Sequence, residues 1–243
     1  MRMAWLVFLP LSVLADEALI AVASNFNPVL ETLRADFEAG SPHAIRLSSG
    51  STGMLYAQIV NGAPYDAFLA ADQVRPAKLE ANGFGVPGTR FTYAEGRLAL
   101  WAHSAGVIAD TVRESLQSDQ LKKLAIANPA LAPYGSAARQ ALQAKGLWES
   151  VSDRLVFGEN ASQAFSMAAL GNADASIVAL SHVLLARERF EGHYLEIPVT
   201  LHSPIRQDAV LLAGGADNEA ARAFLSFLKR PAVREKIATY YGY

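Results

Sequence analysis

The chain has 243 residues, 51% of them hydrophobic, which is typical of a folded protein of one or two domains and not of a disordered chain. Its 21 basic and 23 acidic residues give a formal charge of −2 without any basic block, so nucleic acid is not an expected partner. The chain contains no cysteine, which excludes disulfides, thiolate metal sites and a cysteine nucleophile.

The beginning of the chain has the composition of an export signal. Arg2 supplies a positive charge, Ala4 to Leu14 is a mostly apolar run, and Val13-Leu14-Ala15 loosely fits the small-x-small pattern of a cleavage site. This pattern predicts a secretory signal peptide over residues 1–15, cleaved after about Ala15. The run is too short to cross a bilayer, so we expect an exported, periplasmic protein.

In the first part of the chain, short apolar runs alternate with amphipathic segments. The runs predict strands at 18–23, 44–48 and 65–70, followed by extended segments at 91–93 and 97–102 with a turn at Glu95-Gly96 between them. The amphipathic segments predict three helices: one from a cap at Asn27, with Pro28 in its first turn, to Gly40, one ending near Asn61-Gly62, and one from a cap at Asp72 to Asn82-Gly83.

The same alternation continues to the end of the chain. After an apolar run at 121–127, strands are expected at 155–157, 175–179, 197–199 and 209–213. Helices are expected from about Ser136 to Lys145, around Phe165 up to Gly171, from Ser181, from 218 to 228 and from 232 to 240. Strands that alternate with helices favour an α/β fold with largely parallel sheets.

One stretch, Ser49-Gly50-Ser51-Thr52-Gly53, lies between a predicted strand and a predicted helix. The first amides of a helix lack intrahelical partners, and the helix dipole places partial positive charge there, so amides and hydroxyls at this position suit an oxyanion. The same residues are also typical of a simple N-cap. The stretch is not a Walker A loop, because no lysine follows, and it lacks the Gly-x-Ser-x-Gly spacing of a nucleophile elbow.

Similar corners recur along the chain. They are Ser24-Asn25, Ser51-Thr52-Gly53, Pro133-Tyr134-Gly135 and Asn160-Ala161-Ser162. In open α/β sheets, ligands bind outside the carboxyl ends of the strands, so two corners from each of two lobes are expected to meet across a cleft. Their donors are neutral hydroxyls and amides, which suits a small, fully ionised anion, although this argument does not select among oxyanions.

Catalysis is not expected from the sequence. The five histidines are scattered without metal-ligand spacing, and capping or loop anchoring accounts for Asp66 and Asp72. No serine lies in a recognised nucleophile context, but serine and histidine partners need not be adjacent in sequence. An exported hydrolase with a histidine near Ser51 therefore stays open as an alternative.

Taken together and in order, several motifs resemble those of the periplasmic molybdate-binding proteins of ABC transporters. They are Ala23-Ser24-Asn25-Phe26, Ser48-Ser49-Gly50-Ser51-Thr52-Gly53, Tyr56-Ala57-Gln58-Ile59, Asn61-Gly62-Ala63-Pro64-Tyr65-Asp66, Ala70-Ala71-Asp72, and Asn128-Pro129 through Ala132-Pro133-Tyr134-Gly135. The resemblance covers essentially the whole chain after the signal peptide. It implies a bilobal periplasmic binding protein of type II, with two α/β lobes, a two-strand hinge and the ligand cleft between the lobes.

The resemblance also implies residue roles. Ser24 and Thr52 would donate hydrogen bonds to the anion, Ser51 would be a further contact, and Asn25 would add a backbone amide or a side-chain donor. From the other lobe, the amides of Tyr134 and Ala161 would donate. Many members carry a tyrosine where this sequence has Ala179, so Tyr134 and Asn25 are expected to compensate for that hydroxyl.

The remaining expectations concern boundaries, ligand and partners. The first lobe is predicted to hold 16–96 and 207–243, and the second 97–206, with hinge strands near 97–102 and 207–213. The implied ligand is molybdate or tungstate, with no cofactor and no other metal, and the implied partner is a membrane ABC permease served by a monomer. A related receptor for another tetrahedral oxyanion such as sulfate is the nearest alternative, since selection among these anions depends on cavity size.

Overall fold

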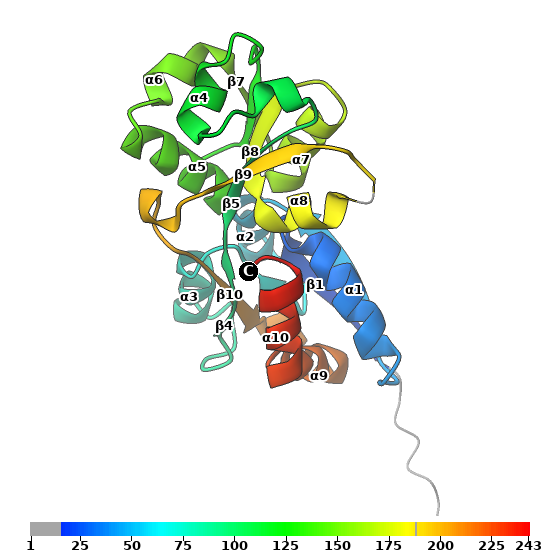
Figure 1. Ribbon diagram of the computed structural model, residues 1–243. Helices are drawn as coiled ribbons and strands as arrows, with labels where there is room; N and C mark the ends of the chain where they lie inside the picture. The colour runs from blue at the N-terminus through cyan, green and yellow to red at the C-terminus, as the bar shows by residue number, and fades with distance from the viewer. Residues whose placement is uncertain (1–15, 188) are drawn as a thin grey trace, which may run out of the picture.

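The computed structural model describes residues 16–187 and 189–243 and shows two lobes, each built on a five-stranded sheet (Figure 1). The two-lobed α/β fold predicted from the sequence is thereby confirmed. The predicted signal peptide over residues 1–15 lies outside the described residues. Among the residues that are described, no helix combines the length and apolar character needed to cross a membrane.

The first lobe has the strand order β2-β1-β3-β10-β4. Its strands are β1 (Glu17–Ala23), β2 (Ala44–Gly50), β3 (Ala67–Leu69), β4 (Phe91–Gly96) and β10 (Ile205–Leu211), of which β1, β2 and β3 run parallel and β10 runs antiparallel to β3 and β4. Its helices are α1 (Asn27–Glu38), α2 (Thr52–Val60), α3 (Val74–Ala81), α9 (Glu219–Leu228) and α10 (Pro231–Tyr240).

Helices cover both faces of this sheet because successive side chains of β1 point to opposite sides. Ile20 and Val22 pack with Phe224 of α9 in one core cluster, whereas Ala21 packs with Leu55 of α2 in another. Burying apolar side chains on both faces is the main source of stability for such a sheet and fixes its register.

The second lobe has the strand order β7-β6-β8-β5-β9. Its strands are β5 (Leu98–Ala102), β6 (Leu124–Ala127), β7 (Leu155–Gly158), β8 (Ala175–Ala179) and β9 (His193–Ile197), of which β6, β7 and β8 run parallel and β5 runs antiparallel to β8 and β9. Its helices are α4 (Val112–Gln117), α5 (Pro133–Ala144), α6 (Trp148–Val151), α7 (Ala161–Ala169) and α8 (Leu180–Ala186).

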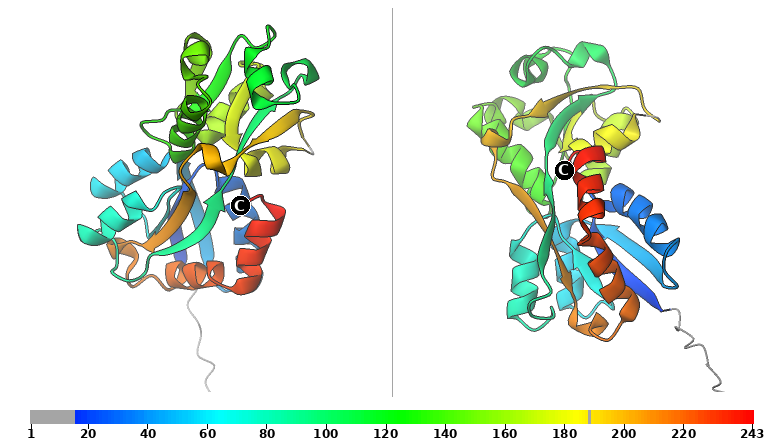
Figure 2. Two further views of the ribbon diagram at one scale, coloured as in Figure 1. Left: turned by 60° about the vertical axis from the view of Figure 1, so that its left-hand side comes forward. Right: turned by 60° about the horizontal axis from the view of Figure 1, so that its bottom comes forward.

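The chain crosses between the lobes where β4 is followed directly by β5, and again where it returns from β9 into β10 (Figure 2). A β-bulge interrupts the pairing of β10 with β4, because Gln207 pairs with Ala94 whereas Asp208 pairs with Thr92. The bulge leaves Tyr93 without a partner in β10. Its hydroxyl lies 3.2 Å from the side-chain oxygen Oε1 of Gln207.

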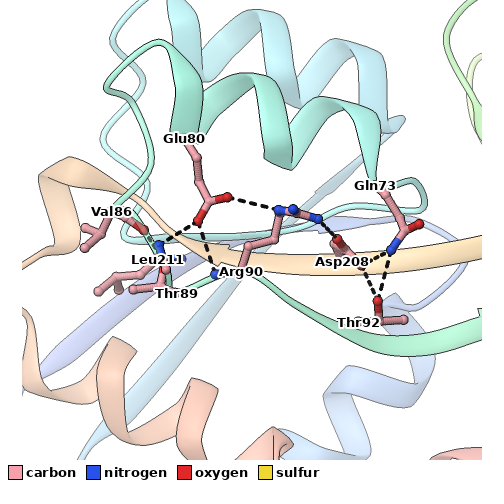
Figure 3. A network of polar contacts seen from close by, with 9 residues as sticks. Gln73, Glu80, Val86, Thr89, Arg90, Thr92, Asp208 and Leu211 are labelled. Carbon is pink, nitrogen blue, oxygen red and sulfur yellow. Dashed lines mark hydrogen bonds and ion pairs between the residues drawn. The ribbon is translucent and has the colours of Figure 1, made fainter.

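A buried polar network holds this bulge in place (Figure 3). The carboxylate of Asp208 is 1% exposed and accepts hydrogen bonds from Arg90 at 2.6 Å, Thr92 at 2.6 Å and Gln73 at 3.0 Å. Arg90 also pairs with Glu80 of α3 at 3.0 Å. Because both oxygens of the buried carboxylate accept hydrogen bonds and one of the donors is charged, its desolvation is compensated.

Several predicted boundaries are wrong for identifiable reasons. Glu95 and Gly96 do not form a turn, since both belong to the crossing strand β4. The strands predicted at 197–199 and 209–213 are observed at His193–Ile197 and Ile205–Leu211, because polar residues within them obscure the apolar pattern. The short helix α4 was not predicted at all.

Helix starts also differ from the predictions. The N-cap of α1 is Phe26 and not Asn27, α5 begins at Pro133 and not near Ser136, and α8 begins at Leu180. The N-cap of α3 is Gln73, yet the Asp72 carboxylate still accepts a hydrogen bond from the Arg75 amide at 2.9 Å. Asp72 therefore satisfies one first-turn amide from a position just outside the cap.

Candidate functional site

The four polar corners predicted from the sequence meet around one small cavity between the lobes, with a volume of about 10 Å³. The cavity is lined by Ala23, Ser24, Asn25, Gly50, Ser51, Thr52, Ala71, Ala132, Pro133, Tyr134 and Ala161. All six residues predicted to bind a ligand are in this set: Ser24, Asn25, Ser51, Thr52, Tyr134 and Ala161. Each is at most 4% exposed, so the structure gathers them into a nearly closed site.

Three helices begin at this cavity, and their first turns supply amide donors. Thr52, Tyr134 and Ala161 lie at the starts of α2, α5 and α7, where amides have no intrahelical acceptor. Over residues 16–187 and 189–243, no protein acceptor takes a hydrogen bond from these three amides. Unpaired amides at converging helix N-termini favour a negatively charged ligand.

The three hydroxyls of the cavity are also set up to donate. Thr52 Oγ1 accepts a hydrogen bond from the Ala71 amide at 3.1 Å, Ser51 Oγ accepts from the Met54 amide at 3.4 Å, and Ser24 Oγ accepts from the Ser162 amide at 3.4 Å. A hydroxyl has one proton of its own, and these contacts leave it unused. The capping interpretation of Ser51 is therefore correct, and it is compatible with ligand binding.

The side chain of Asn25 faces the hinge. Its Nδ2 group donates to Gln207 Oε1 at 2.8 Å and to the Tyr243 hydroxyl at 3.3 Å. A carboxamide has two N–H donors, and both are engaged in these bonds. Of the two possibilities for Asn25, the geometry thus favours its backbone amide as the donor to a ligand.

The hydroxyl of Tyr134 also lies against the hinge. Gln207 Nε2 donates to it at 3.3 Å, and a Cβ atom built on Gly96 would lie only 2.1 Å from it. Glycine is therefore required at this point of β4 for the tyrosine to fit. Burial raises the pKa of Tyr134 well above its usual value, so the hydroxyl stays neutral.

Hydrogen bonds cross between the lobes around the cavity. Ser162 Oγ donates to the Ser24 carbonyl at 2.9 Å, and the Gly53 amide donates to the Leu131 carbonyl at 2.9 Å. Because the Ser162 proton is used in this way, the 3.0 Å contact with His182 Nε2 requires that nitrogen to carry a proton. The lobes are thus in direct contact on both sides of the cavity.

The structure gives no support to a catalytic triad. The histidine hydrogen-bonded beside the cavity, His182, contacts Ser162 and not Ser51. Within the described part of the chain, its Nδ1 atom has no partner, so the carboxylate that would orient a catalytic histidine is missing. The described residues also contain no group of three or more histidine, aspartate or glutamate side chains that could hold a metal ion.

Sequence reasoning missed the residues that support the cavity from behind, namely Tyr93, Gln207 and Tyr243. Gln207 is fully buried in β10, and a polar residue within a buried strand is the one signal that pointed to it. Ser162 lies in a corner that was singled out, but its bond to Ser24 could not be foreseen.

Comparisons with known proteins identify the family of the chain. The family model described as "Bacterial extracellular solute-binding protein" matches residues 18–243. The chain is 44% identical to the molybdate-binding protein ModA of Azotobacter vinelandii, over 94% of this chain and 90% of that protein. It is 40% identical to the molybdate-binding protein ModA of Rhodobacter capsulatus, over 97% and 91% of the two chains.

Solved structures with the same fold include a molybdate-binding protein and a sulfate-binding protein. The periplasmic molybdate-binding protein of Azotobacter vinelandii superposes with a TM-score of 0.85 at 39% identity, covering 92% of this chain and 98% of that one. The sulfate-binding protein SubI of Mycobacterium tuberculosis superposes with a TM-score of 0.75 at 12% identity, covering 94% and 92%, a likeness that shows the fold alone.

Proposed function

We propose, since this chain belongs to the bacterial extracellular solute-binding proteins and among them to the molybdate-binding proteins, that it captures molybdate or tungstate outside the cytoplasm. It would then deliver the anion to a membrane ABC permease. The relatives are binding proteins and not enzymes, so the role is that of a receptor without catalysis.

The observation that carries this proposal is that the cavity lining presents free hydrogen-bond donors and no carboxylate. Three hydroxyl protons, from Ser24, Ser51 and Thr52, and the amides of Thr52, Tyr134 and Ala161 are free to donate. Each hydrogen bond to a charged group contributes about 1.5–3 kcal/mol, so several of them bind a dianion without a counter-charge. A protonated phosphate needs an acceptor, and the lining holds no carboxylate.

The proposal includes how the lobes move. We assign 16–96 and the chain from β10 onward to the first lobe, and the chain from 97 to the residues before β10 to the second, two residues from the predicted boundary at 206–207, with β4–β5 and the segment entering β10 as hinge. Ligand binding would stabilise the closed form, which docks on the permease, and the receptor would act as a monomer. Export by a signal peptide cleaved after about Ala15 completes this proposal.

A thermal-shift panel tests ligand class and selectivity together. The protein beginning at Asp16 is heated with molybdate, tungstate, sulfate or phosphate, each far above its expected dissociation constant. A ligand at a hundredfold excess adds about 2.7 kcal/mol to folding stability. A rise in Tm with molybdate and tungstate alone supports the proposal. A rise with sulfate as well would overturn the selectivity, and no rise with any anion would overturn the function.

A further inference from the structure

The segment that follows α10 lies between the two lobes (Figure 1). Gly242 has a positive φ of 69°, and a Cβ atom there would come within 2.9 Å of Leu184 and 3.0 Å of Leu180, both on α8 of the second lobe. This turn carries the Tyr243 ring against Phe26, with ring centroids 5.3 Å apart. Tyr243 is thereby placed directly behind the Ser24-Asn25 corner.

The Tyr243 hydroxyl contacts Asn25 on two sides. It donates to the Asn25 carbonyl at 2.9 Å and lies 3.3 Å from Asn25 Nδ2, which donates to it. One hydroxyl thus fixes both the main chain and the side chain of a residue that lines the cavity. Because the peptide planes of a tight corner are linked, the orientation of the neighbouring Ser24 depends on the same contact.

The same hydroxyl reaches the second lobe. Ser181 Oγ, in the first turn of α8, lies 2.9 Å from it and donates to it, because the Tyr243 proton is used by the Asn25 carbonyl; Ser181 Oγ also lies 3.3 Å from that carbonyl. Asn25 in turn joins Gln207 on the hinge strand β10. One group therefore contacts the ligand corner directly and the opposite lobe through Ser181, and it reaches the hinge by way of Asn25.

We propose that the Tyr243 hydroxyl is a positioning group, which holds the Asn25 corner in its ligand-binding geometry and ties that corner to the second lobe through Ser181. This inference rests on the proposed function of the cavity as an oxyanion site. The bond to Asn25 lies within the first lobe and persists when the lobes separate. The bond to Ser181 forms only when the lobes meet, so its loss speeds release of the anion.

The variant that tests this is Tyr243→Phe, which removes the hydroxyl and keeps the ring. The matched control is Tyr65→Phe, because the Tyr65 hydroxyl also makes two side-chain hydrogen bonds, to Ser48 and Gln58, but away from the cavity. Stopped-flow binding of molybdate gives the association and dissociation rates separately. Hydrogen exchange of a peptide spanning residues 22–30, without ligand, reports on the corner itself.

We expect Tyr243→Phe to raise the molybdate dissociation rate about tenfold, with little change in the association rate, and to speed exchange of the corner peptide. Tyr65→Phe should leave the dissociation rate within about twofold of the original protein. Ser181→Ala should raise the dissociation rate less in the Tyr243→Phe background than in the original protein, because the Ser181–Tyr243 contact is already lost there and only the 3.3 Å contact of Ser181 with the Asn25 carbonyl remains to be broken.

Two results would overturn the proposal: a dissociation rate unchanged by Tyr243→Phe, or one raised equally by Tyr65→Phe. Should the original protein bind no oxyanion, the proposed function fails by itself. Hydrogen exchange then decides whether Tyr243 positions the corner, since faster exchange in Tyr243→Phe alone supports it and equal exchange in all variants refutes it.

Discussion

Replacing Thr52 by valine removes one hydroxyl that has two roles in the structure. Thr52 Oγ1 is fully buried and accepts a hydrogen bond from the Ala71 amide at 3.1 Å, and its own proton is free for the anion. Losing a hydrogen bond to a charged ligand costs about 1.5–3 kcal/mol, which corresponds to about a 10- to 150-fold rise in Kd. Leaving the buried Ala71 amide unpaired costs about 1–3 kcal/mol of folding stability.

Two measurements separate these effects. Titration calorimetry with molybdate gives the Kd of Thr52→Val, and urea denaturation without ligand gives its free energy of unfolding. The control is Thr52→Ser, which keeps the hydroxyl and should retain affinity within a few-fold. A folded Thr52→Val protein that binds molybdate as tightly as the original would show that this hydroxyl does not face the anion.

Three further predictions concern the hinge and the lobe contacts. Gly96→Ala places a methyl group 2.1 Å from the Tyr134 hydroxyl, so overpacking should lower the free energy of unfolding by about 1–3 kcal/mol. Calorimetry should also show weaker molybdate binding by this variant. Burial lowers the pKa of His182 from 6.5 to about 4, so the unfolded chain binds more protons between these pH values. Stability should therefore fall by up to about 3 kcal/mol as the pH drops from 6.5 to 4, measured by urea denaturation. Asp208→Ala removes the buried acceptor of Arg90, Thr92 and Gln73 and should cost about 1–3 kcal/mol by the same method.

Each of these predictions has its own control. Gly40→Ala should be nearly neutral, because the nearest atom to the added Cβ is 4.0 Å away. His182→Gln should flatten the pH dependence, and an unchanged slope would show that another group causes it. Asp110→Ala changes an exposed carboxylate and should shift stability by less than about 0.5 kcal/mol. A similar loss in Asp110→Ala and Asp208→Ala would contradict the role given to the network.

The sequence was most informative where one rule dominated. Short apolar runs such as 18–23 and 175–179 became largely buried strands with parallel neighbours, because both faces of such strands are covered by helices. The rule failed for β9 and β10. The first is a half-exposed edge strand, and the second carries Arg206, Gln207 and Asp208, whose polar side chains serve the bulge and the hinge.

The candidate site was predictable to the same degree. Small polar residues after parallel strands could be placed at one edge of each sheet, and the four corners do meet there. The supporting layer could not be foreseen, because Asn25 contacts Gln207 and Tyr243 at separations of 182 and 218 residues along the chain. A local sequence pattern does not indicate contacts between residues so far apart, whereas a helix start or a buried strand is recognisable from about ten consecutive residues.

The make-up of the cavity lining has a consequence for the energetics of transport. Its one titratable side chain, Tyr134, keeps its proton throughout the physiological pH range, so capture of a fully ionised anion neither takes up nor releases protons. The heat of binding should therefore be the same in buffers of different ionisation enthalpy. Under the proposed function, titration of the cavity lining therefore does not drive release of the anion, and opening of the two lobes is the step expected to release it.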